Sequence, residues 1–148
     1  MNEEIYKETM RKFIYISRLH RAAFESKLSS LGIHQSQHHL LMHIAKFGGL
    51  PSQKKLAEHF KISPAAVAVS LKKLESSGFI EREQSDDARV NKITITPLGK
   101  EVIEKTHELF EEMDRQVFSG ISKDELNSAN DFFTKILANL EGMGAGKE

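Results

Sequence analysis

The sequence predicts a mainly α-helical fold with one small β-hairpin, in which long helices flank a central domain of short helices and the hairpin. Two observations predict this class. Apolar residues recur at helical spacing in most segments, with capping signals at the segment ends. Between residues 79 and 96 the pattern changes to strand-like alternation. A chain of 148 residues suffices for one compact domain, or for a small domain whose flanking helices need a partner.

The amino-terminal segment predicts two helices. Apolar residues such as Ile5, Phe13 and Leu28 recur at roughly helical spacing from residue 3 to residue 31, and Gly32 supplies a stop. A second helix is predicted from Gln35 to Phe47, before a pair of glycines.

Two short helices follow. The first is predicted up to Phe60, with Ser52 as its cap. The second is predicted from residue 64 to about residue 76, because Ser63 is a favourable N-cap and Pro64 occupies the first helical position, where its missing N–H costs nothing.

Residues 79–83 and 89–96 are predicted to form the two strands of a hairpin, with residues 84–88 as the turn. A helix then runs from about Pro97 to Gly120, and a last helix begins at the capping box formed by Ser122 and Glu125. The predicted organisation is therefore an amino-terminal dimerisation helix over 1–33, a central domain over 34–99, carboxy-terminal dimerisation helices over 97–141 and a flexible tail over 142–148.

Composition narrows the function. The chain has no cysteine, which excludes disulfides and thiolate metal sites, and it has no apolar run of membrane-spanning length. Its acidic start is unlike a secretion signal, so a cytoplasmic protein is expected. Basic and acidic residues number 7 and 4 over 1–50, 9 and 6 over 51–100, and 5 and 11 over 101–148, giving net charges of +3, +3 and −6. The positive charge that DNA binding requires is thus kept in the first two thirds.

The helix over 64–76 has two different faces. Val67, Leu71 and Leu74 share one face and are expected in the core. The outer surface is small, partly apolar and basic toward its end. Small side chains let a helix enter a major groove, where methyl groups can contact thymine and lysines can reach phosphates. The predicted DNA contacts from this helix and its cap are Ser63, Ala65, Ala66, Ala68, Val69, Lys72 and Lys73. The alternative is an alanine-rich helix that packs against another part of the protein.

The hairpin tip carries Asp87 and Arg89. A guanidinium at the tip of such a wing suits a narrow minor groove, with the aspartate orienting it through a charge-assisted hydrogen bond. If these two residues are considered without the elements around them, the alternative is a solvated ion pair on the surface. Because this pair directly follows a helix-turn-helix, contact with DNA is the more specific interpretation.

Residues 63–99 resemble the MarR (multiple antibiotic resistance regulator) family, and the resemblance extends over nearly the whole chain. The stretch carries the family's recognition helix, a Leu-Glu-x-x-Gly passage into the wing that ends in arginine, the Asp-x-Arg wing tip, and an Ile-Thr-x-x-Gly exit where leucine is usual.

The resemblance implies a winged helix-turn-helix in a two-fold homodimer that binds palindromic operator DNA and is commonly released by a small ligand. It places Arg89 in the minor groove, and the residues that it places toward the bases are Pro64, Ala65, Ala66, Ala68 and Val69. Ala68 and Val69 replace the threonine and arginine of many relatives, so base recognition is expected to rest more on shape and methyl contacts. Dimerisation also follows from the long apolar stripes, which exceed what one small winged domain could cover; an intrachain helical cap is the alternative.

Seven histidines raise the question of a metal or an effector. His39 and His43 lie one turn apart and could share a zinc ion if His107 or an acid joined them, as some MarR relatives do. The favoured hypothesis is instead an apolar effector pocket for an aromatic acid, lined by Phe13, His20, Phe24, Met42 and His43.

The function expected from the sequence is a DNA-binding repressor without enzyme activity, bound cofactor or membrane partner. Three alternatives stay open: a zinc-sensing regulator of the same fold, a winged helix that binds proteins rather than DNA, and a metal hydrolase. The hydrolase lacks a general base, because leucine follows His39 where a glutamate would be needed.

Overall fold

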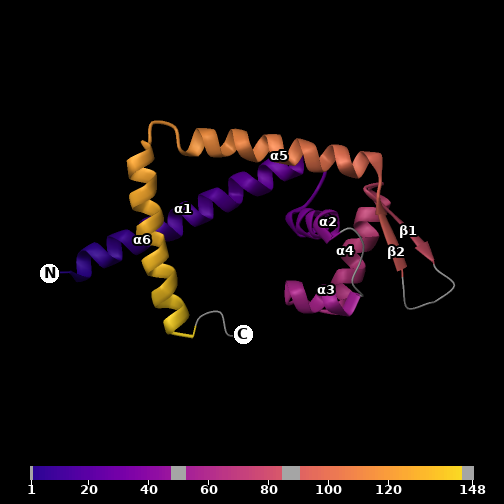
Figure 1. Ribbon diagram of the computed structural model, residues 1–148, viewed down its shortest axis with the longest axis horizontal. Helices are drawn as coiled ribbons and strands as arrows, with labels where there is room; N and C mark the ends of the chain where they lie inside the picture. The colour runs from indigo at the N-terminus through magenta and orange to yellow at the C-terminus, as the bar shows by residue number, and fades with distance from the viewer. Residues whose placement is uncertain (1, 48–52, 85–90, 145–148) are drawn as a thin grey trace. The chain divides into compact units, whose positions relative to one another are not determined.

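A computed structural model describes residues 2–47, 53–84 and 91–144 of the chain. In these residues the chain forms six helices and a two-stranded sheet (Figure 1). Contacts divide it into two compact units, residues 1–110 and 111–148. None of the helices in the described ranges combines the length and apolar character that a membrane span requires.

The first unit begins with helix α1 (Glu3–Ser30), which is followed by α2 (Gln35–Phe47), α3 (Gln53–Phe60) and α4 (Pro64–Ser76). Helix α4 packs against both α2 and α3. Strands β1 (Ile80–Gln84) and β2 (Asn91–Ile95) come next, and helix α5 (Pro97–Val117) carries the chain from the first unit into the second. Helix α6 (Lys123–Gly142) forms most of the second unit.

The core of the first unit lies among α2, α3, α4 and the root of the hairpin. Most of its fully buried side chains come from the apolar faces predicted from helical spacing, among them Leu28, Leu41, Leu56, Val67, Leu71 and Leu74. Strand β1 adds Ile80. Three residues of α4 are thus inside, as predicted, which fixes the opposite face of that helix outward.

The hairpin is antiparallel, and its register pairs Ile80 with Ile95 and Arg82 with Ile93. Ile93 is buried and Thr94 exposed, which confirms the predicted alternation. Gln84 differs from its prediction: it pairs with Asn91 in the ladder rather than lying in the turn.

Two of the three predicted side-chain caps are confirmed, and the third, Ser52, lies outside the described residues. Ser63 caps α4, and Ser122 and Glu125 form a complete capping box at α6. The ends were predicted less well. Helix α5 stops at Val117 rather than near Gly120, and α6 includes Gly142, which the prediction gave to the tail. Residues 145–148 of that predicted tail lie outside the described ranges.

Candidate nucleic-acid interface

The start of α4 is fixed by a side-chain cap. Ser63 is extended (φ −68°, ψ 150°), and its hydroxyl accepts a hydrogen bond from the backbone N–H of Ala66 at 3.1 Å. Pro64 follows as the first helical residue. Because Ser63 and Pro64 are both exposed, the amino-terminal end of α4 is presented to solvent. A helix start of this kind favours the approach of an anion such as a phosphate.

The outward face of α4 combines small apolar side chains with two lysines. Val69 is 54% exposed, which is unusual for a β-branched apolar residue in a folded core domain. Ala65, Lys72 and Lys73 are exposed and Ala66 and Ala68 partly so. The structure therefore places all eight predicted residues, from Ser63 to Lys73, on the accessible side of the helix or at its cap.

An ion pair ties α4 to the first strand of the wing. The Arg82 guanidinium donates to one carboxylate oxygen of Glu75 through Nε at 3.0 Å and through Nη2 at 2.6 Å. These hydrogen bonds from Arg82 hold the pKa of the Glu75 carboxyl below its ordinary value. The pair links the last turn of α4 to β1, so it contributes to the angle between helix and wing.

Sequence reasoning did not identify this pair. Glu75 and Arg82 both stand in the motif that leads into the wing, but they are seven residues apart across a helix end and a turn. Complementary charge at those two motif positions was the signal that could have revealed it.

The root of the wing is joined to α4 and α5 through Thr96. Its hydroxyl donates to the carbonyl of Gly78 at 2.5 Å and accepts from the N–H of Gly99 at 3.0 Å. Gly78 adopts a left-handed conformation (φ 76°) that ends α4 and turns the chain into β1. One side chain thus connects the end of the recognition helix, the hairpin and the start of α5.

Asp87 and Arg89, the predicted wing tip, lie outside the described residues. The structure describes the two paired strands that precede and follow them in the chain. The strand ladder is continuous from Ile80 to Gln84 and from Asn91 to Ile95, so the tip is bounded by the paired ends Gln84 and Asn91.

The predicted effector residues are only partly brought together. Met42 and His43 line a groove of about 640 Å³ whose other walls come from α3 and α5. Phe24 stacks on Phe110 at 4.4 Å between ring centroids, and His20 stacks on Phe24 at 6.3 Å. Phe13 is 41% exposed on α1 and is not among the described residues that line the groove.

His39, His43 and His107 line the same groove. Within the described ranges, however, no group of three or more histidine, aspartate or glutamate side chains has an arrangement that could hold a metal ion. The zinc-sensing alternative therefore gains no support from this geometry.

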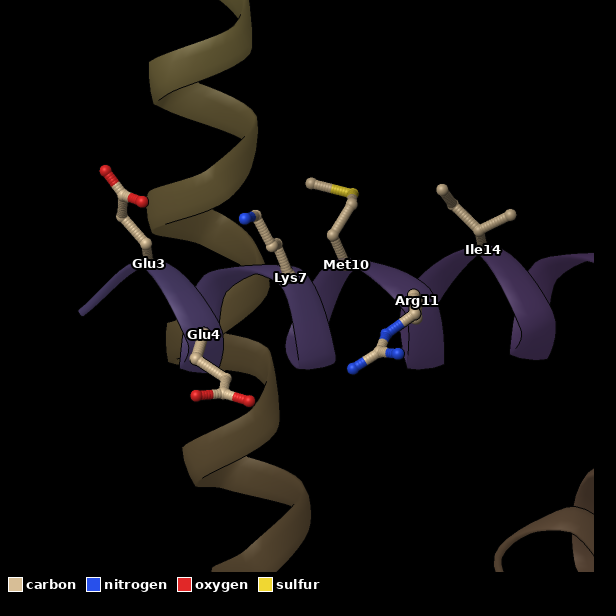
Figure 2. A pocket seen from close by; sticks show the side chains of 6 residues that line it. All are labelled: Glu3, Glu4, Lys7, Met10, Arg11 and Ile14. Atoms are coloured by element: carbon tan, nitrogen blue, oxygen red, sulfur yellow. The ribbon is translucent and has the colours of Figure 1, made fainter. Parts of the chain in front are cut away.

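A separate hollow of about 880 Å³ lies on the amino-terminal half of α1 (Figure 2). Glu3, Lys7, Met10 and Ile14 project from one side of the helix, and Glu4 and Arg11 point the other way. All six described lining residues belong to one exposed helix, so this hollow offers no converging set of groups for a ligand.

Comparison with known proteins relates these features to one family. A model of the MarR family matches residues 33–90, from the start of the central helices into the hairpin. The chain is 33% identical over 118 residues to the HTH-type transcriptional regulator BilQ of Clostridium symbiosum, and the match covers 76% of this chain and 81% of BilQ.

Solved structures agree. The fold matches MepR, a transcription regulator of the Staphylococcus aureus multidrug efflux pump MepA, with a TM-score of 0.75 and 27% identity over 86% of this chain and 95% of MepR. It also matches MepR in complex with DNA, with a TM-score of 0.63 and 25% identity over 86% of this chain and 93% of that one. These relatives are transcription regulators rather than enzymes. With its exposed recognition helix and the wing joined to it, this chain belongs to the MarR family of DNA-binding transcription regulators.

Proposed function

We propose that the protein is a repressor that binds a palindromic operator as a homodimer and is released by a small aromatic acid. The observation that carries this proposal is the outward face of α4, where small apolar side chains and two lysines are exposed on a helix held from behind by Val67, Leu71 and Leu74. A compact dimer that occupies an operator excludes other proteins from the same DNA, which is the simplest route to repression.

The groups on α4 divide into two roles. Pro64, Ala65, Ala66, Ala68 and Val69 are proposed to face base edges, because short side chains allow close approach in a major groove about 12 Å wide. Ser63, Lys72 and Lys73 are proposed to contact phosphates, which fix register and orientation without reading sequence.

Arg89 is proposed to enter the minor groove, with Asp87 orienting its guanidinium. The support is the position of these residues between the paired strand ends, together with the ion pair of Glu75 and Arg82 that fastens β1 to α4. A wing held in this way would bring its tip to the groove next to the one that α4 occupies.

The dimer is proposed to form through α1 and the helices that follow the wing. Of the 28 residues of α1 only Leu28 is buried, and the 20 residues of α6 include none that is buried. Large apolar side chains on these helices are more than two fifths exposed, among them Ile5, Ile14, Ile16, Leu19, Phe132, Phe133, Leu137 and Leu140. Exposed apolar surface of this extent is typical of an interface.

The effector is proposed to bind near Phe24, Met42 and His43. Two of these residues line the 640 Å³ groove, and the third packs edge-on against His38, which also lines it. His20 and Phe13, farther along α1, complete the set predicted from the sequence.

Lysine substitutions on α4 test the DNA interface. If Lys72 and Lys73 contact phosphates, Lys72→Ala and Lys73→Ala will each weaken binding and reduce the slope of log K against log salt by about 1 per contact, hence about 2 per dimer. Fluorescence anisotropy with a selected genomic fragment over a salt series measures both quantities. Lys135→Ala, an exposed lysine of α6, is the matched control and should leave affinity and slope unchanged.

Equal salt slopes for Lys72→Ala, Lys73→Ala and Lys135→Ala would contradict the proposed interface. They would favour instead a winged helix that binds a protein.

A further inference from the structure

The outward face of α4 is apolar over its first two turns. From residue 64 to residue 69 no side chain can donate or accept a hydrogen bond. Within this stretch only Val67 is buried, and the other five residues are exposed or partly exposed. The part of the helix that is proposed to face base edges therefore offers apolar groups and no polar side chain.

The backbone at the start of α4 adds few donors. Pro64 has no N–H. The N–H groups of Ala66 and Val67 donate to the hydroxyl and carbonyl oxygens of Ser63, at 3.1 Å each. These two turns therefore lack the paired hydrogen-bonding groups with which side chains usually read a base.

Val69 is the largest of the accessible side chains from residue 64 to residue 69. It is 54% exposed, and it lies one turn beyond Ala65 on the same side of the helix. Its two methyl groups are held in place, because a β-branched side chain has one strongly preferred rotamer in a helix. The helix itself is fixed from behind by three buried residues, Val67, Leu71 and Leu74. Val69 is thus a rigid apolar contact at a fixed position.

The major groove offers one kind of apolar group to such a contact. Guanine, adenine and cytosine present only hydrogen-bonding groups along their major-groove edges, whereas thymine also presents a methyl group at carbon 5. 5-Methylcytosine carries the same methyl group at the same ring position. Burial of one methyl group against another apolar group raises affinity about fourfold.

We propose that Val69 reads the 5-methyl group of a pyrimidine, so that α4 recognises its half-site through a methyl contact rather than through hydrogen bonds. The assignment requires α4 to lie in the major groove, so it rests on the proposed function. It adds the chemical group that the helix recognises. It also makes thymine and 5-methylcytosine interchangeable in this contact, so that methylation of a cytosine at this position creates the contact.

The other proposed contacts do not depend on this methyl group. Lys72 and Lys73 are proposed to contact phosphates, which carry no sequence information. Arg89 is proposed to enter the minor groove, where thymine and uracil present the same acceptor. Removal of the 5-methyl group therefore separates the contribution of Val69 from those of the lysines and the wing.

Deoxyuridine is a suitable probe, because it is thymidine without the 5-methyl group and pairs with adenine in the same way. A genomic fragment selected by the protein is amplified with either deoxythymidine or deoxyuridine triphosphate. Fluorescence anisotropy at one salt concentration then gives the affinity for both forms. The unmodified chain should bind the uracil form about fourfold more weakly per half-site, hence about sixteenfold for a dimer.

A second pair of duplexes distinguishes the two sources of the methyl group. At the thymine whose single replacement by uracil weakens binding most, the T·A pair is changed to a pair of guanine with cytosine or with 5-methylcytosine. The methylated duplex should bind about as tightly as the original. The unmethylated duplex should bind about fourfold more weakly per half-site.

Val69→Ala removes most of the protein's side of the contact. Because Val69 is exposed and alanine favours a helix, this variant should fold normally, which circular dichroism checks. It should bind the thymine form severalfold more weakly than the unmodified chain does, and it should lose most of the preference for thymine over uracil. Lys72→Ala is the matched control on the same helix. It should weaken binding to both forms by the same factor and so keep that preference.

Three results would overturn the proposal: equal affinity for the thymine and uracil forms, a preference for thymine that Val69→Ala retains in full, or 5-methylcytosine that binds no better than cytosine. The first result would leave DNA shape as the basis of recognition by α4. None of the three argues against DNA binding, which selection of the fragment has already demonstrated. Failure to select any fragment would instead contradict the proposed function, and this assignment with it.

Discussion

At the scale of single residues, the burial of His38 makes the stability of the folded chain depend on pH. Its ring is closed in by Phe24 and Phe110, and burial lowers its pKa from 6.5 to about 4. Between these two values the imidazole is neutral in the folded chain and protonated in the unfolded chain. Unfolding then takes up a proton, so the folded state loses stability as pH falls through this range.

We therefore expect the free energy of unfolding to decrease from pH 6.5 to pH 4, with a contribution from His38 of up to about 1.4 kcal/mol per pH unit. Replacement by an apolar residue of similar size, His38→Leu, should flatten this dependence, whereas His34→Gln, at an exposed position, should not. Urea denaturation at a series of pH values measures the slope. Parallel curves for the unmodified chain and His38→Leu would show that His38 titrates normally in the folded state.

Residues whose role depends on neighbours in sequence were predictable. Ser63, Ser122 and Glu125 were predicted as caps from local spacing, and each forms the expected hydrogen bond. The burial of His38 and the pairing of Glu75 with Arg82 were not predicted, because both arise only when segments from different elements meet. The roles of Arg89 and Asp87 remain predictions.

At the scale of elements, the junction of α4, the hairpin and α5 depends on close backbone packing at Gly99. A Cβ added there would overlap the carbonyl oxygen of Phe79 and lie 2.8 Å from a methyl carbon of Ile95. The same carbonyl accepts a hydrogen bond from the N–H of Thr96 at 3.1 Å. A side chain at position 99 would force the wing root away from α5.

Gly99→Ala should consequently destabilise the chain by about 1–3 kcal/mol, the usual cost of overpacking, and weaken DNA binding through the displaced wing. Gly142→Ala is a suitable control, because no atom lies within 4 Å of its added Cβ and alanine is favoured in a helix. Urea denaturation gives the first effect and fluorescence anisotropy the second. A Gly99→Ala variant as stable as Gly142→Ala would mean that the junction relaxes without cost.

The helices were predicted more accurately than the places where they end. Helices α2 and α4 have the predicted bounds, because glycines, a serine cap and a proline mark their limits. Helix α5 ends at Val117, before the predicted stop at Gly120. No breaker residue marks Val117, so local signals could not place that end. Gln84 joined the strand because Asn91 pairs with it across the hairpin, which is a nonlocal effect.

At the scale of the whole molecule, positive and negative charge lie in different parts of the chain. The recognition helix lies in the part of the chain that is net positive, and residues 101–148 carry 5 basic and 11 acidic side chains. A net positive segment attracts the phosphates of DNA, and a net negative segment repels them. The sequence predicted this asymmetry and the long amphipathic helices. Many apolar side chains of these helices are exposed in the single chain, so the surface that they are proposed to meet in a dimer stays a prediction.

We propose that two copies of α4 read the two halves of one operator. Selection of genomic fragments at physiological salt, followed by protection mapping of the bound fragments, reveals how the half-sites are arranged. We predict enriched fragments with two half-sites related by a two-fold axis and centred about 10 base pairs, one helical turn, apart. Absence of enrichment, or protection of a single half-site by one copy of the chain, would rule out this mode of DNA binding.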